Sequence, residues 1–193
     1  MHRRKYLVLV AILVLPLDAL SRQRMLSLEF APQTAQFATA AEEYRQIWQA
    51  EGTRIVAAME KATNLSFSPA PIRVVVYEGT SFSGDERRPM QLRASYPSNT
   101  KKATLVHELA HRLIGTLALP ANFEEHPTIF LFVYDVWTTL WGKEFADAEV
   151  IVESGRRGLY DYEGAWKAAL AMSASERAAK FSEFAAMHRP RRR

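Results

Sequence analysis

The 193-residue sequence contains no cysteine. This absence excludes thiolate metal ligands, cysteine nucleophiles and disulfide bonds together. Any metal ion that the chain binds must therefore be held by nitrogen and oxygen ligands. A lack of disulfides is compatible with an exported protein, because a chain of this length can bury a sufficient hydrophobic core.

The apolar run near the N-terminus, residues 6–15, is too short to span a bilayer comfortably. It follows a positively charged segment at residues 2–5, ends at Pro16, and precedes an imperfect small-x-small cleavage pattern at residues 17–19. This order predicts that residues 1–20 are an export signal, or an N-terminal membrane anchor if they are not cleaved. A buried N-terminal helix is the alternative. We therefore expect a periplasmic or extracellular protein that contacts a membrane only through this segment.

The net charge of +4 comes from the two ends of the chain. Residues 3–5 carry three cationic side chains and residues 189–193 carry four, so the remainder has a net charge of −3. The charge pattern therefore gives no support for nucleic-acid binding. We expect a linker at residues 21–33, one domain at residues 34–188 and a solvated basic tail at 189–193, without internal repeats.

Hydrophobic periodicity predicts a mainly helical domain with a small sheet. Residues 72–77 are rich in β-branched side chains, and residues 90–96 alternate between apolar and polar, so both segments are predicted strands. Thr100 is the expected N-cap of the helix that follows. The predicted helices are 34–62, 101–117, 127–141, 143–154, 160–172 and 174–187. The expected fold class is α+β, predominantly helical, with the sheet packed on the helix at 101–117.

Within that helix, residues 107–111 spell H-E-x-x-H. Residues four apart on a helix share one face, so His107 and His111 can direct their imidazole nitrogens at one metal ion. Glu108 is then placed to act as general base on a metal-activated water. With 5 histidines in the chain, roughly 0.01 such matches are expected by chance. The motif predicts metal-assisted hydrolysis.

Residues 104–113 as a whole resemble the zincin metallopeptidases. Thr104 lies three residues before the first histidine, as in that family, whereas Arg112 replaces a residue that is usually uncharged. The metzincin extension does not match, because Ile114 and Leu117 occupy the positions of its glycine and histidine. The resemblance implies a single catalytic Zn²⁺, peptide or protein substrates, and an edge strand at residues 90–96 that pairs with an extended substrate.

A catalytic zinc site needs a third protein ligand. His126 is the first choice, followed by Glu125 and then Glu124, since all three precede the helix that starts near Pro127. Asp135 or a later glutamate are further alternatives. For Asp135 we also weigh hydrogen bonding to a ligand imidazole, or a structural bond to Arg93, Arg112 or a helix N-terminus.

Three tyrosines, Tyr134, Tyr160 and Tyr162, are candidate oxyanion donors or ordinary packing aromatics. The predicted function is an exported zinc metallopeptidase. One alternative is a catalytically inactive zincin-like domain that binds metal or recognises a partner, and another is a chance motif on a helical domain.

Overall fold

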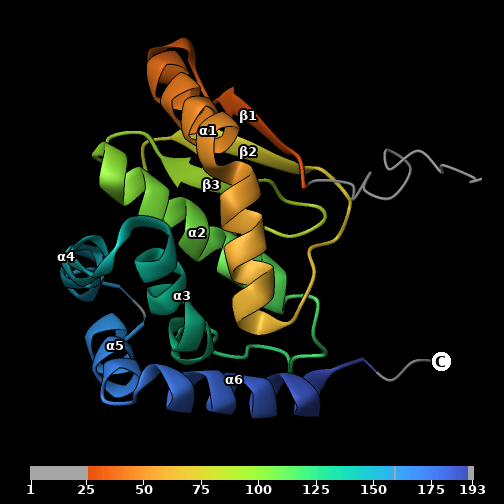
Figure 1. Ribbon diagram of the computed structural model, residues 1–193. Helices are drawn as coiled ribbons and strands as arrows, with labels where there is room; N and C mark the ends of the chain where they lie inside the picture. The colour runs from red at the N-terminus through yellow and green to blue at the C-terminus, as the bar shows by residue number, and fades with distance from the viewer. Residues whose placement is uncertain (1–25, 159, 191–193) are drawn as a thin grey trace, which may run out of the picture.

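The structure is a computed structural model that describes residues 26–158 and 160–190 (Figure 1). The expected signal at 1–20 and residues 191–193 lie outside the described residues. The helices are α1 (Ala38–Thr63), α2 (Ser98–Ile114), α3 (His126–Trp141), α4 (Lys143–Ser154), α5 (Tyr162–Leu170) and α6 (Ala174–His188), with a short 3₁₀ helix, η2 (Ala35–Phe37), before α1. The strands are β1 (Leu28–Pro32), β2 (Ile72–Tyr77) and β3 (Met90–Arg93).

The predominantly helical α+β class is confirmed. Among the described residues, no helix combines the length and apolarity required to cross a membrane.

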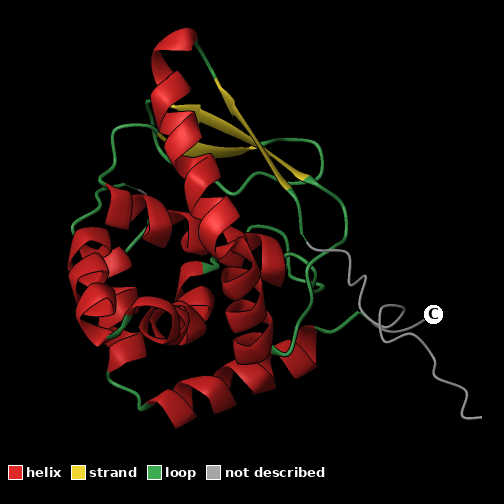
Figure 2. Ribbon diagram, turned by 45° about the horizontal axis from the view of Figure 1, so that its top comes forward, coloured by secondary structure: helices red, strands yellow, loops and turns green. Residues whose placement is uncertain are grey.

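The sheet has the order β1-β2-β3, and both pairs of neighbours are parallel. Alternate side chains of β2 are buried, because α1 and α2 pack on one face of the sheet (Figures 1 and 2). Strand β1 corrects the expected linker at 21–33: Leu28 and Phe30 are buried in the core, and Leu28 is in register with Ile72. Its five residues are too few, and too mixed in polarity, to show a clear alternation.

Strand β3 is shorter than the predicted 90–96, and its outer edge is already occupied. The backbone N–H and C=O of Gln91 both pair with Phe82. The N–H of Arg93 donates to Ser81 Oγ, while its C=O accepts from the hydroxyl of Tyr44. A substrate strand therefore cannot pair directly with β3 at Gln91 or Arg93, contrary to the expectation drawn from the zincin resemblance.

Helix α3 lies at the centre of the helical layer. It contacts α1, α2, α4, α5 and α6, so side chains all around it are buried. Its Phe130 ring stacks on Trp166 of α5 with ring centroids 3.8 Å apart. Gly142 ends the helix with φ of 89°, a backbone conformation that favours glycine. These contacts hold the N-terminus of α3 against the middle of α2.

Helix α2 carries the H-E-x-x-H residues and is almost entirely buried. It begins at Ser98 rather than after Thr100, so Thr100 is not its N-cap, and the Thr100 hydroxyl donates to Glu149 of α4. Its apolar side chains, which include Leu109 and Leu113, are fully buried. Its opposite side supports the imidazoles of His107 and His111.

Candidate metal centre

Three histidines from two helices form one group. Each offers one ring nitrogen, and these atoms from His107, His111 and His126 all lie within 4.8 Å of one another. The Nε2 atoms of His107 and His111 are 3.2 Å apart, because the two residues are one turn apart on α2. The chain therefore contains three histidines close enough to bind a metal ion.

His126 joins this group because α3 begins at that residue and its first turn faces α2. Its ring centroid is 5.3 Å from that of His107 and 4.9 Å from that of His111. His126 is only 6 % exposed and His107 only 1 % exposed, so water has limited access to either imidazole. The first-choice third ligand is thus the residue that the structure brings to the pair.

A carboxylate lies against the Nδ1 atom of each imidazole. Glu125 is 2.5 Å from His111 Nδ1, and Glu124 is 2.5 Å from His126 Nδ1. The two alternative ligands of the sequence analysis therefore orient histidines instead of joining the metal-facing group. An Nδ1–H that donates to a carboxylate leaves Nε2 with its lone pair free, which is the form that binds metal.

Glu153 of α4 orients the remaining histidine, His107. Its Oε2 atom accepts from His107 Nδ1 at 3.1 Å and from the indole N–H of Trp166 at 3.2 Å. Its Oε1 atom is 2.9 Å from the same Nδ1, without hydrogen-bond geometry, and 3.2 Å from Arg156 Nη1. The side chain is fully buried.

The sequence analysis did not single out Glu153, although a signal was present. Ala146, Glu149 and Glu153 follow helical spacing and form the buried face of α4, whereas Ile151 on the same helix is 74 % exposed. A helix whose buried face carries two glutamates must provide partners for them inside the protein. For Glu153 these partners are a histidine, an indole and an arginine.

The local environment shifts the pKa values of the imidazoles in different directions. Burial lowers the pKa of His107 to about 3 and also lowers that of His126, where the nearby His111 acts in the same direction. Burial opposes protonation of His111 too, but the hydrogen bond to Glu125 and the nearby Glu108 outweigh it and raise its pKa. His107 and His126 are therefore neutral at pH 7, as metal ligands must be.

Glu108 follows His107 on α2 and lines the same cleft. Its side chain is 4 % exposed, and burial raises the pKa of its carboxyl to about 7. A carboxyl group with a pKa near the operating pH can both accept and return a proton. This is the property required of the predicted general base.

The cleft above the histidines has a volume of about 1490 Å³. Two of the candidate tyrosines line it: the ring of Tyr162 is 4.5 Å from that of His126, and the ring of Tyr160 is 4.7 Å from it. Burial raises the pKa of Tyr162 to about 12, so its phenol stays protonated. Tyr134 does not line the cleft, and its hydroxyl donates to Asp147.

The structure gives physical reasons for two unusual residues. Arg112, the departure from the zincin pattern, donates to the carbonyl oxygens of Ser83 at 2.6 Å and Arg88 at 3.2 Å, so it holds the loop beside the cleft. Asp135 accepts two hydrogen bonds from Arg177 of α6, at 2.6 and 2.9 Å. Asp135 thus has the structural role, with a partner that the sequence analysis did not name.

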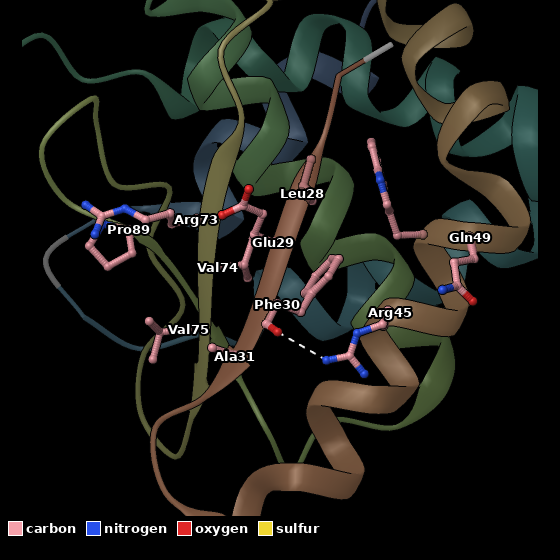
Figure 3. A pocket seen from close by; sticks show the side chains of 11 residues that line it. Leu28, Glu29, Phe30, Ala31, Arg45, Gln49, Arg73, Val74, Val75 and Pro89 are labelled. Carbon is pink, nitrogen blue, oxygen red and sulfur yellow. Dashed lines mark hydrogen bonds between the residues drawn. The ribbon is translucent and has the colours of Figure 1, made fainter.

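A second hollow, of about 590 Å³, lies along β1 and contains no comparable chemistry (Figure 3). It is lined by Leu28, Glu29, Phe30, Ala31, Arg45, Trp48, Gln49, Arg73, Val74, Val75 and Pro89. Arg45 donates to the carbonyl oxygen of Phe30 there. With one carboxylate and no histidine, its lining offers no metal-binding set, so the larger cleft is the candidate site.

No protein-family model matches the chain, and no significant match was found to a curated protein or to a solved structure. The functional argument therefore depends on the geometry of the cleft.

Proposed function

We propose that this protein is a zinc-dependent, zincin-like metallopeptidase. One observation carries the proposal: three imidazoles converge, each with a carboxylate at Nδ1, beside a buried glutamate that lines the same cleft. A simple packing cluster of histidines does not require three separate carboxylates in these positions. This arrangement is the one expected when all three Nε2 atoms bind a cation.

The residues fit zinc better than calcium or magnesium. A tetrahedral zinc ion with bonds of ~2.0–2.1 Å places two nitrogen ligands about 3.3 Å apart, close to the 3.2 Å between the Nε2 atoms of His107 and His111. Three nitrogen ligands and no thiolate suit a catalytic zinc site with one open position, whereas calcium and magnesium prefer oxygen. When bound, such an ion polarises a peptide carbonyl and activates water.

The side chains of the cleft supply the remaining chemistry. The carboxylate of Glu108 accepts a proton from the attacking water and then, as the carboxylic acid, delivers it to the leaving amine nitrogen. The protonated phenol of Tyr162 donates a hydrogen bond to the oxygen that becomes negative in the tetrahedral transition state. Glu124, Glu125 and Glu153 hold the imidazoles in the tautomer that leaves Nε2 free.

The test uses the zinc-loaded full chain, a broad library of internally quenched peptides and the variant Glu108→Gln. We expect one zinc per chain in both proteins, with cleavage by the unsubstituted chain and at least a hundredfold less by Glu108→Gln. Glu144→Gln on the exposed start of α4 is the matched control and should retain full activity. Bound zinc without cleavage would instead favour a metal-binding or partner-recognition domain, and failure to bind zinc would indicate a chance motif.

We also propose that the protein is exported, on the basis of the pattern at residues 1–20. The test is expression of the full chain in a bacterial host, followed by fractionation and N-terminal sequencing of the product. Recovery only from the cytoplasm, with residue 1 or 2 at the N-terminus, would contradict it.

A further inference from the structure

An arginine, Arg156, extends into the cleft beside the histidine group. It follows α4 and lines the cleft together with His107 and Glu108. Its guanidinium contacts Oε1 of Glu153 at 3.2 Å and donates to Thr104 Oγ1 at 3.2 Å. Its side chain is largely buried, so this cation is held at a defined position near the reacting groups.

Two aromatic rings contact the guanidinium in the cleft wall. The guanidinium carbon of Arg156 lies 5.7 Å from the ring centroid of Tyr162 and 6.0 Å from that of Tyr96. Contacts of this kind fix the plane of an arginine fork. A guanidinium has five N–H donors, so the hydrogen bond to Thr104 and the ion pair with Glu153 leave donors for a further acceptor.

Arg156 and its carboxylate partner form an ion pair, and other cations line the cleft beside it. Among the described residues, Glu153 is the carboxylate within ion-pair distance of Arg156, and Glu153 also accepts from His107. Two more cations line this side of the cleft. Arg93, which forms an ion pair with Glu78, lies 5.3 Å from the same Tyr96 ring, and Arg157 has no ion pair with a described residue.

Two carboxylates that line the cleft contact the other two histidines. Glu124 contacts His126, and Glu125 contacts His111, whereas Arg156 is connected to His107 through Glu153. Arg156 therefore lies on the His107 side of the cleft, away from the carboxylates that contact His111 and His126. A substrate carboxylate is favoured beside Arg156 over a position beside Glu124 and Glu125.

We propose that Arg156 binds a carboxylate of the substrate, on the His107 side of the metal centre. This inference rests on the proposed peptidase function and specifies its substrate class: peptides with a free C-terminal carboxylate or an acidic side chain close to the scissile bond. Both sources present the same planar anion, which suits the fork of a guanidinium. Arg156 is thus a specificity-determining residue.

The test measures binding, so it does not depend on turnover. The proteins are full chains loaded with zinc and carrying Glu108→Gln, and the readout is fluorescence anisotropy of dansylated hexapeptides. One sequence without acidic side chains is made as the C-terminal acid and as the amide. A third set carries the amide with a single glutamate at each central position, with glutamine at the same positions as its reference.

We expect the acid or one of the glutamate peptides to bind roughly tenfold more tightly than its neutral counterpart. Whichever peptide binds more tightly shows whether the carboxylate comes from the C-terminus or from an acidic side chain. Arg156→Gln should reduce this preference to about one, and Arg156→Lys to a few-fold, because lysine keeps the charge without the fork. Arg45→Gln, which removes the arginine of the other hollow, is the control and should leave the preference unchanged.

Equal binding of charged and neutral peptides by the parent chain would overturn the proposal, as would a full preference in Arg156→Gln. If Arg156→Gln loses zinc or does not fold, Arg156→Lys decides, since a preference equal to that of the parent chain contradicts a role for the arginine fork. Failure of the peptidase proposal would appear separately, as absent zinc or absent cleavage in the chain that retains Glu108.

Discussion

Glu153 Oε2 lies 3.1 Å from Nδ1 of His107, although 46 residues separate them in the sequence. The contact joins α4 to the middle of α2, and the same carboxylate accepts from the Trp166 indole of α5. One buried glutamate therefore connects three helices at the back of the histidine group. Through its ion pair with Arg156 it also connects the imidazole of His107 to an arginine that lines the cleft.

The first prediction concerns this contact. Glu153→Gln should weaken zinc binding about 10–100-fold, because a neutral amide no longer stabilises the His107 tautomer that leaves Nε2 free. Glu149→Gln is the matched control, since Glu149 lies one turn earlier on the same buried face and contacts Thr100 instead of a histidine. Competition with a chelator of known affinity measures both. Equal zinc affinities for the two variants would show that Glu153 does not support the site.

The second prediction separates the third ligand from the residues that orient the imidazoles. His126→Ala should abolish stoichiometric zinc binding at micromolar metal, because two imidazoles alone form an incomplete site. Glu125→Gln should still bind one zinc ion, with about 10–100-fold lower affinity, because only the hydrogen bond to His111 is lost. Zinc titration of the metal-free chains checks both. The reverse ranking would make Glu125 the ligand.

The sequence predicts those residues of the site whose positions follow from their spacing along the chain. His107, Glu108 and His111 lie on one helix, so helix geometry alone gives their relative placement, whereas the approach of His126 to them depends on the packing of α3 on α2. The helices and β2 were predicted within a few residues because their apolar patterns are long and regular.

The remaining features depend on contacts between residues far apart in sequence. Nothing near Glu153 in the sequence indicates that it meets His107, since that requires the packing of α4 on α2. The same holds for the pairing of β1 with β2 and for the ion pair of Asp135 with Arg177. Arg156 lies in a loop, and nothing near it in the sequence indicates that it contacts Tyr96 and Tyr162 in the wall of the cleft.

The third prediction tests the structural role of Asp135. Asp135→Asn should lower the free energy of unfolding by roughly 1–3 kcal/mol, because the buried Arg177 guanidinium loses a carboxylate that accepts two hydrogen bonds. Zinc affinity should stay within twofold of the parent chain. Urea denaturation of the metal-free proteins gives the stability, and chelator competition gives the affinity. A large loss of zinc affinity with unchanged stability would instead indicate that Asp135 supports the metal site.

The fourth prediction uses the other buried glutamate of α4. Burial raises the pKa of Glu149 above its usual value, the nearby Glu153 acts in the same direction, and one oxygen of its carboxylate has no hydrogen-bond partner among the described residues. The folded protein therefore disfavours the ionised form. Its stability should decrease as the pH rises from the usual glutamate pKa of 4.5 through the higher value of the folded state.

Glu149→Gln removes this ionisation while keeping an oxygen that accepts from Thr100. We expect the variant to be more stable than the parent chain by about 1 kcal/mol at pH 8, a rise in Tm of roughly 2–4 °C for a chain of this length. At pH 4 the difference should vanish, because Glu149 is then protonated in both the folded and the unfolded parent chain. Thermal unfolding of the pair at pH 4, 6 and 8 checks the trend, with Glu144→Gln as an exposed control that should show none. A variant less stable than the parent at pH 8 would mean that the Glu149 carboxylate stabilises the contact between α4 and α2.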